Sequence, residues 1–142
     1  MTPMTKMTPA VAALGRVLLA AIFIQGGFGK LLSPEQTMGY IGASGLPMPG
    51  IAYAVSVAVE LGGGLAILFG IQARLVSAAL AVFCVVTAVQ FHFHPGQQMQ
   101  MINFMKNISM AGGFLQITAF GAGAWSLDAL LASRHHARPA LA

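Results

Sequence analysis

Four long runs of apolar and small residues alternate with short polar segments along the chain. A helix rising about 1.5 Å per residue needs about 20 residues to cross a hydrocarbon core of about 30 Å, and each run has about this length. Backbone amides in lipid must be bonded within their own segment, so isolated spans are helices. The pattern predicts an all-α integral membrane four-helix bundle, with spans at residues 10–29, 50–71, 75–92 and 107–127 of a single domain, residues 1–142.

The composition also favours a membrane protein. Apolar residues make up 57% of the chain and charged residues 7%, against about 25% charged residues in an average soluble domain. Seven Lys and Arg residues and three Asp and Glu residues cannot cover the surface of a soluble domain. The net charge of +4 reflects the scarcity of acids rather than a strip of bases, which argues against nucleic acid as a partner. The expected partner is the lipid bilayer.

The distribution of bases predicts the orientation. The side of the predicted bundle that holds the N-terminus carries Lys6, Arg16, Arg74, Arg134 and Arg138, whereas the opposite side carries Lys30 and Lys106. Cytoplasmic loops of membrane proteins carry an excess of Lys and Arg. Both termini are therefore expected in the cytoplasm.

One carboxylate, Glu60, lies in the middle of the second predicted span. It is about ten residues, or about 15 Å, from each membrane boundary, where a charge facing lipid costs roughly 3 to 17 kcal/mol. The side chain is therefore expected to face the bundle interior. Arg16, in the first span, is the expected partner, because a guanidinium can extend several ångströms along its own stem. Such a pair is either a structural contact that fixes helix register or part of a ligand or proton site.

Other polar residues lie toward the outer ends of the predicted spans. Lys30 follows the first span, and Lys106 and Asn107 lie at the start of the fourth. The two lysines either extend to the membrane interface or bind an anionic group. They join Arg16 and Glu60 as candidates for a buried polar or ligand site.

Small residues recur at every fourth position of the second span: Gly50, Ala54, Ala58, Gly62, Ala66 and Gly70. Helices in lipid associate through faces of this kind, since small residues let two backbones come close. We therefore expect this row to contact another helix.

A metal site is not expected. His92 and His94 are two residues apart, so on a helix their side chains point about 200° apart. Metal sites normally need three or four converging ligands, and the single cysteine, Cys84, lies inside an apolar run. We interpret Cys84 as a small buried hydrophobe.

Several motifs, taken in order, resemble the DoxX family of small four-helix bacterial membrane proteins. They extend from about Leu14 to Leu130 and read GRVLLAAIFIQGGFGKL, GLPMP, VELGGGLAILFGIQAR, KNISMAGG and GAGAWSLDALL. The resemblance implies a multi-pass protein of the bacterial cytoplasmic (inner) membrane. It singles out Lys30, Glu60, Arg74, Lys106, Asn107 and Asp128. Of these, Arg74 and Asp128 both fall at cytoplasmic helix ends, where we expect them to contact each other.

The resemblance further implies a redox association. Some relatives are membrane subunits of a thiosulfate:quinone oxidoreductase, and others accompany thiol-redox or oxidative-stress proteins. Our first hypothesis is therefore a subunit or anchor of a quinone-linked redox or oxidative-stress system, with quinone as its cofactor and a redox protein as its partner. A lone cysteine provides no dithiol for electron transfer, so the sequence does not decide whether the chain is an enzyme.

Two further hypotheses come from other functional classes. The chain could be a non-catalytic membrane scaffold or assembly protein, with the connection of about 20 residues after the first span as its docking surface. It could also be a small solute or lipid carrier that acts as a homo-oligomer, with the midplane charge marking the pathway. No inverted repeat is visible in the sequence, which ranks the carrier last.

Overall fold

The computed structural model describes the backbone of residues 3–136 and the side chains of residues 8–134. This part of the chain is all-helical, with six α-helices, one π-helical segment and no strand. The helices are α1 (Pro3–Leu32), α2 (Pro34–Ala43), α3 (Pro49–Phe69), α4 (Ala73–Thr87), η1 (Ala88–His92), α5 (Gln98–Phe120) and α6 (Leu127–His136). Arg138, one of the bases counted for orientation, lies outside the described residues.

Proline and glycine set most of the helix boundaries. Pro34 and Pro49 begin α2 and α3, where a missing backbone N–H costs no helical hydrogen bond. Gly70 ends α3 in the left-handed conformation (φ 68°), and the amide of Ile71 donates to the carbonyl of Ala66 at 2.8 Å. This tight turn places α4 directly beside α3.

Three described helices are long and apolar enough to cross a membrane: Thr8–Leu32, Pro49–Phe69 and Ala73–His92. They correspond to the first three predicted spans. The bounds of the fourth prediction, residues 107–127, were wrong, because α5 begins at Gln98 and ends at Phe120. Gly121 and Gly123 both have positive φ (83° and 82°) and break the helix before α6. α5 is not among the apolar spans, and its first half carries Gln, Asn and Lys residues.

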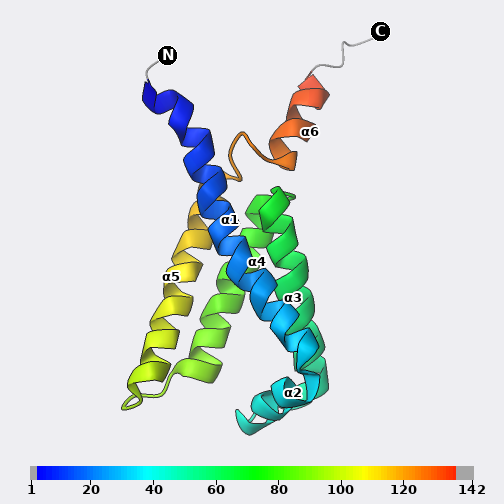
Figure 1. The fold of residues 1–142 in the computed structure, drawn as a ribbon, viewed down its shortest axis with the longest axis vertical. Helices are drawn as coiled ribbons and strands as arrows, with labels where there is room; N and C mark the ends of the chain where they lie inside the picture. The colour runs from blue at the N-terminus through cyan, green and yellow to red at the C-terminus, as the bar shows by residue number, and fades with distance from the viewer. Residues whose placement is uncertain (1–2, 137–142) are drawn as a thin grey trace.

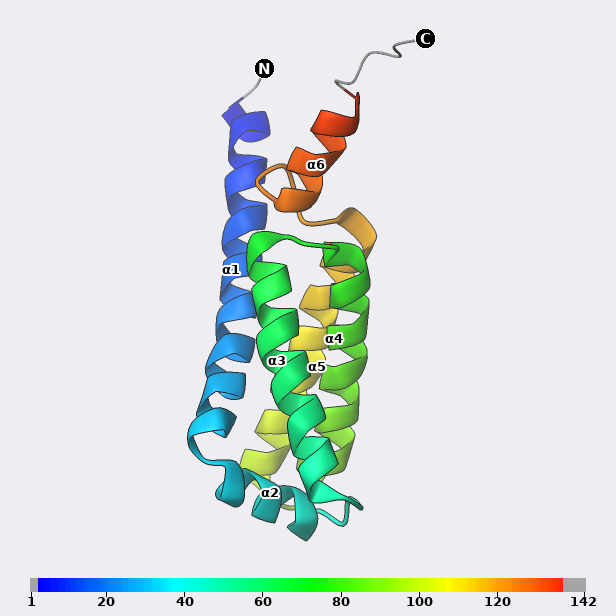
Figure 2. The same ribbon diagram turned by 90° about the vertical axis from the view of Figure 1, so that its right-hand side faces the viewer.

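The long helices pack as two antiparallel pairs, α1 with α3 and α4 with α5. The pairs lie close together near α6 and separate toward α2, which lies across the open end of the resulting wedge (Figure 1). Figure 2 shows the start of α1 and the end of α6 at one end of the molecule and α2 at the other. We call these two ends of the molecule the α6 end and the α2 end.

The core fills the region where the two pairs meet. Its buried residues are Ala20, Phe23, Ile67, Leu80, Ala81, Cys84, Ala111 and Phe114. The rings of Phe23 and Phe114 meet edge to face, with centroids 5.1 Å apart. The outward faces of the long helices carry large exposed hydrophobic side chains, as expected for surfaces in contact with lipid.

The small-residue row on α3 does not pack as the sequence predicted. A Cβ atom on Gly62 would meet nothing within 4 Å, and Ala54 and Ala58 are exposed. Within the row, Gly70 is closely packed, because a Cβ there would lie 2.5 Å from Ser126 in the loop before α6. The close approaches of α3 to α4 and α1 come from the neighbouring glycines: a Cβ on Gly63 would lie 2.9 Å from a methyl of Leu80 in α4, and one on Gly64 would lie 2.9 Å from Ile24 in α1. The glycines that face neighbouring helices, Gly63 and Gly64, therefore follow Gly62 of the predicted row by one and two residues.

Candidate functional site

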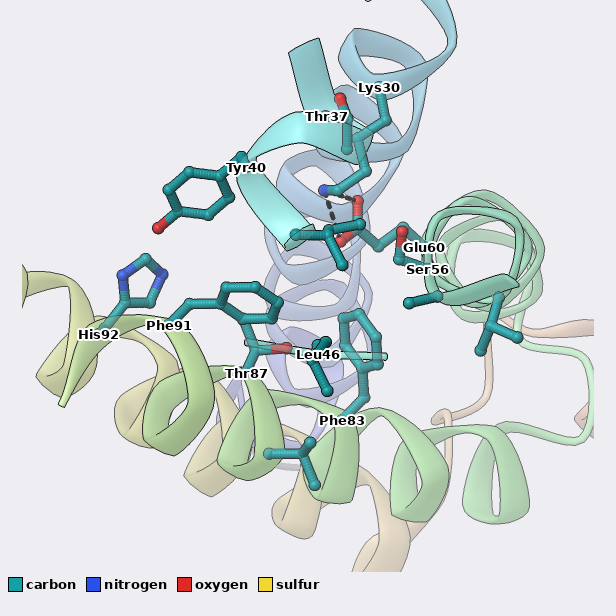
Figure 3. Close-up of a pocket in the computed structure, with 14 residues that line it drawn as sticks. Lys30, Thr37, Tyr40, Leu46, Ser56, Glu60, Phe83, Thr87, Phe91 and His92 are labelled. Carbon is teal, nitrogen blue, oxygen red and sulfur yellow. Dashed lines mark hydrogen bonds and ion pairs between the residues drawn. The ribbon is translucent and has the colours of Figure 1, made fainter. Parts of the chain in front are cut away.

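A cavity of about 340 Å³ occupies the wedge at the α2 end (Figure 3). α3 and α4 are in contact at Gly63 and Leu80, and the cavity begins one helical turn farther along each helix, at Glu60 and Phe83. Further residues of α3 and α4 line the cavity, and residues of α1, α2, the connection before α3, and η1 complete the lining. The cavity therefore exists because the two helix pairs separate between this contact and the α2 end.

An ion pair forms the polar wall of the cavity. Lys30 Nζ lies 2.8 Å from Glu60 Oε1 and 2.7 Å from Oε2, and the Glu60 side chain is 10% exposed against 28% for Lys30. Tyr53 donates its hydroxyl to the Lys30 carbonyl at 3.3 Å, which ties α3 to the end of α1. Figure 3 shows both charged groups directed toward the space beneath α2, with Ser56 beside them.

Two glycines of α1 allow this pair to form. A Cβ on Gly26 would lie 3.0 Å from Glu60 Oε2, and a Cβ on Gly27 would lie 2.7 Å from Leu61 Cγ. α3 thus approaches the backbone of α1 closely at the level of Glu60. The glycine doublet makes room for the carboxylate as well as for helix packing.

The expected pairing of Arg16 with Glu60 was wrong, and helix register explains why. In the antiparallel pair, Gly26 lies beside Glu60, whereas Arg16 lies beside Gly70. Ten residues of helix separate these two levels, or about 15 Å, which is too far for a guanidinium to bridge. Lys30 is only one turn from the level of Glu60 and takes the place expected for Arg16.

Arg16 instead holds the loop that follows α5. Its side chain is 5% exposed and donates to the carbonyls of Ala122 (2.5 Å) and Trp125 (2.6 Å). These carbonyls lie in the non-helical segment between α5 and α6, so no helical amide is available to them. Arg16 is therefore a structural contact at the α6 end, and it does not line the cavity.

Arg74 and Asp128 lie at the α6 end as expected, but with different partners. Asp128 accepts hydrogen bonds from the amides of Gln72 and Ala73, both at 2.8 Å, and so caps the N-terminus of α4. Arg74 donates to the carbonyl of Ala119 at 2.9 Å, at the end of α5. Each side chain satisfies backbone groups at a helix end, where such groups have no helical partner.

Lys106 and Asn107 are not part of the cavity. Lys106 lies in a separate open groove between α1 and α5, with Ile22, Met101 and Met105. Asn107 donates its amide to the carbonyl of Asn103, in the preceding turn of α5. Of the five predicted ligand candidates, the structure brings together only Lys30 and Glu60.

The aromatic wall of the cavity was not predicted from the sequence. Tyr40 of α2 stacks on Phe91 of η1, with ring centroids 5.6 Å apart and planes at 20°. His92 also lines the cavity, and its Nδ1 lies 2.8 Å from Gln100 Oε1 of α5. π-helical turns often occur at functional sites, because they rotate side chains relative to the α-helical register. The sequence signal for this region was the Pro95–Gly96 pair, which limits how far the helix that contains Phe91 and His92 can continue.

The described residues include no group of three or more His, Cys, Asp and Glu residues that could hold a metal ion. The cavity has the chemistry of an organic-ligand site: mostly apolar and aromatic walls with a few polar groups at fixed positions. A carbonyl group of a bound ligand could accept a hydrogen bond from Lys30, and a hydroxyl group could donate one to Glu60. A ring of the same ligand would contact Phe83, Phe91 or Tyr40.

Fold and site together define a small all-helical membrane protein with a charged pair in the wall of an apolar cavity. The DoxX family model matches residues 11–93, and the chain belongs to this family. It is similar to two Escherichia coli K12 proteins, the inner membrane protein YqjF (37% identical, over 90% of this chain and 97% of YqjF) and the inner membrane protein YphA (34%, over 84% and 89%). No solved structure matches the chain. The protein is thus a multi-pass inner-membrane protein of bacterial type.

Proposed function

We propose that the protein is the membrane-embedded, quinone-binding subunit or anchor of a quinone-linked redox or oxidative-stress system. The observation that carries this proposal is the Lys30–Glu60 ion pair in the wall of an otherwise apolar and aromatic cavity. Charged residues inside membrane segments commonly mark ligand or proton pathways. Membership of the DoxX family is consistent with this role.

The proposal includes four membrane spans and cytoplasmic termini. α5 has 23 residues, which corresponds to about 35 Å of helix and is enough to cross the hydrocarbon core. It packs antiparallel to α4 and completes an even number of passes, since α1 begins and α6 ends at the same end of the molecule (Figure 2). The excess of bases at the α6 end supports a cytoplasmic location for that end.

The cavity suits the headgroup of a quinone. Its volume of about 340 Å³ lies within the range of about 300 to 1,000 Å³ typical of small-molecule sites. The Lys30 ammonium donates to a quinone carbonyl, and the rings of Phe83, Phe91 and Tyr40 contact the quinone ring.

Reduction of a quinone to a quinol consumes two electrons and two protons. The proposed partner dehydrogenase supplies the electrons. Lys30 donates a hydrogen bond to Glu60 at 2.7 Å in the cavity wall. Each proton passes from Lys30 to a quinone oxygen, and Lys30 is protonated again from solvent through Glu60. The chain contains one cysteine, so it cannot form a dithiol of its own.

Quinone binding by the purified protein tests the proposal. We expect a decyl-chain benzoquinone to bind in lipid nanodiscs, and we expect Lys30→Ala and Glu60→Gln to weaken binding at least tenfold. Lys106→Ala is the matched control, because this lysine lies in the other groove. If the wild-type protein fails to bind, or if all three variants bind equally well, the quinone role is wrong.

A scaffold function is a second candidate, and the α6 end favours it. Arg16, Arg74 and Asp128 are all engaged with backbone groups there, which holds the helix ends in one geometry. A rigid end of this kind suits a protein that positions a partner. Co-purification in mild detergent distinguishes the two candidates: a stoichiometric partner without quinone binding supports the scaffold, and a solitary protein that binds quinone excludes it.

A further inference from the structure

The outward faces of α3 and α4 are each marked by a stripe of exposed apolar residues. On α3 the stripe contains Ile51, Val55, Leu65 and Phe69, and on α4 and η1 it contains Leu75, Val82, Val86 and Val89. Successive members of a stripe are three, four, seven or ten residues apart, which keeps them on one face of the helix. In an inner-membrane protein these faces contact the acyl chains.

One residue of each stripe also lines the cavity. These residues are Val55, which is 53% exposed, and Val86, which is 58% exposed. Glu60, in the same lining, is buried. The same two valines therefore face both the lipid and the cavity. The apolar side of the cavity therefore reaches the outward surfaces of α3 and α4, on the α2 side of their contact at Gly63 and Leu80.

The α2 end of the same cavity is covered. The stacked rings of Tyr40 and Phe91 join α2 to η1 across it. Gln90 donates its side-chain amide to the carbonyl of Ser44, at 3.0 Å, and so ties η1 to the connection after α2. Ile41, between these contacts, is 4% exposed. Two contacts and one buried side chain thus cover the cavity at the α2 end, whereas the two valines at its apolar side are exposed.

The cavity is polar on the side toward the bundle interior and apolar on the side toward the outward surface. Lys30, Glu60 and Ser56 lie on the inner side (Figure 3), and the two valines lie at the outward surface. A ligand that satisfies both parts needs a small polar head at one end and an apolar chain at the other. An isolated polar molecule would leave the valine side uncovered, and a plain hydrocarbon would form no hydrogen bond with Lys30 or Glu60.

We propose that the cavity receives its ligand sideways from the bilayer, between α3 and α4, and that the ligand is a single-chain amphiphile with a compact polar head. The head contacts Lys30 and Glu60, and the chain leaves between Val55 and Val86 and remains in the lipid. The statement that the head is a quinone rests on the proposed function, whereas the lateral opening rests on the geometry alone.

A photoreactive lipid tests the opening without a quinone. The protein is reconstituted in vesicles that contain a fatty acid with a diazirine near its carboxyl group, and the labelled residues are mapped by mass spectrometry after illumination. We expect labels on inner-wall residues such as Ser56 and Phe83. Val86→Trp and Val55→Trp should reduce this inner labelling at least fivefold, because an indole fills the opening. Val82→Trp is the matched control, since Val82 is 64% exposed one turn away and does not line the cavity.

A second measurement compares a decyl-chain benzoquinone with the same ring without the chain. We expect the chain to improve binding at least tenfold in the wild type and to bring little improvement in Val86→Trp. Inner labelling without binding of either quinone would retain the lateral opening and remove the quinone. Equal binding of both quinones, together with labels on outward residues only, would remove the lateral opening and retain the quinone. Inner labelling that is unchanged in both tryptophan variants would also overturn the opening.

Discussion

The two ends of the bundle place charged groups in an apolar protein in opposite ways. At the α6 end, Arg16 and Asp128 bind backbone groups that no helix satisfies, and the helices are held together. At the α2 end, Lys30 and Glu60 bind each other in the wall of a cavity, and the helix pairs are apart. A charge that satisfies the backbone replaces missing structural hydrogen bonds, whereas a charge paired with another side chain can change its partner when a ligand arrives.

The largest effect on stability is expected at Arg16. Arg16→Ala leaves the carbonyls of Ala122 and Trp125 without their donor in a buried site, so we expect a loss of about 3 kcal/mol in the free energy of unfolding. Thermal unfolding in detergent measures the change. Arg74→Ala is the control, because its bond to Ala119 is exposed and should contribute less. Equal losses for both variants would mean that the hydrogen bonds of Arg16 contribute no more to stability than the exposed bond of Arg74.

Lys30 and Glu60 should respond differently when changed singly and together. Lys30→Met leaves the buried carboxylate unpaired and should cost about 2 kcal/mol. The double variant Lys30→Met, Glu60→Met removes both charges and should recover most of that stability, since replacing both partners by apolar groups of similar size is often neutral. Quinone binding should stay lost in the double variant. If binding returned with stability, the pair would be structural, like Arg16.

The boundary between the two ends can be tested at adjacent glycines. Gly63→Ala places a methyl group 2.9 Å from Leu80, which is 1% exposed and could shift only by disturbing the packing of the core, so we expect a loss of about 1.5 kcal/mol. Gly62→Ala meets nothing within 4 Å and should be neutral or stabilise the helix by about 0.5 kcal/mol. Unfolding in detergent compares the pair. The reverse order would mean that α3 is rotated from the position described.

Apart from the control variants, the smallest effect is expected at Asp128. Asp128→Ala removes the acceptor for the first amides of α4 and should cost about 1 kcal/mol without affecting ligand binding. Glu35→Ala, in the exposed first turn of α2, is the matched acidic control for stability. A change in quinone affinity in Asp128→Ala would show that the two ends are coupled rather than independent.

Hydropathy predicted the existence and type of the first three spans, because a run of about 20 apolar residues has few alternatives to a membrane helix. It predicted the fourth poorly. The helical start of α5 is polar, and the end of α5 depends on glycines in a conformation that the composition of the run does not reveal. Within the predicted connection of about 20 residues, α2 was missed, although Pro34 is a common first residue of a helix.

Sequence alone determined that Glu60 must be sheltered in a bundle, because the cost of exposing a charge to lipid depends only on depth along a helix. It could not determine which base shelters it. That depends on the register of α1 against α3, set by the glycines at positions 26, 27 and 64, and a shift of a few turns exchanges Arg16 for Lys30. Tertiary structure alone also decided the cavity and the closing of the α6 end, because both arise from residues far apart in the chain whose meeting depends on how the helix pairs diverge.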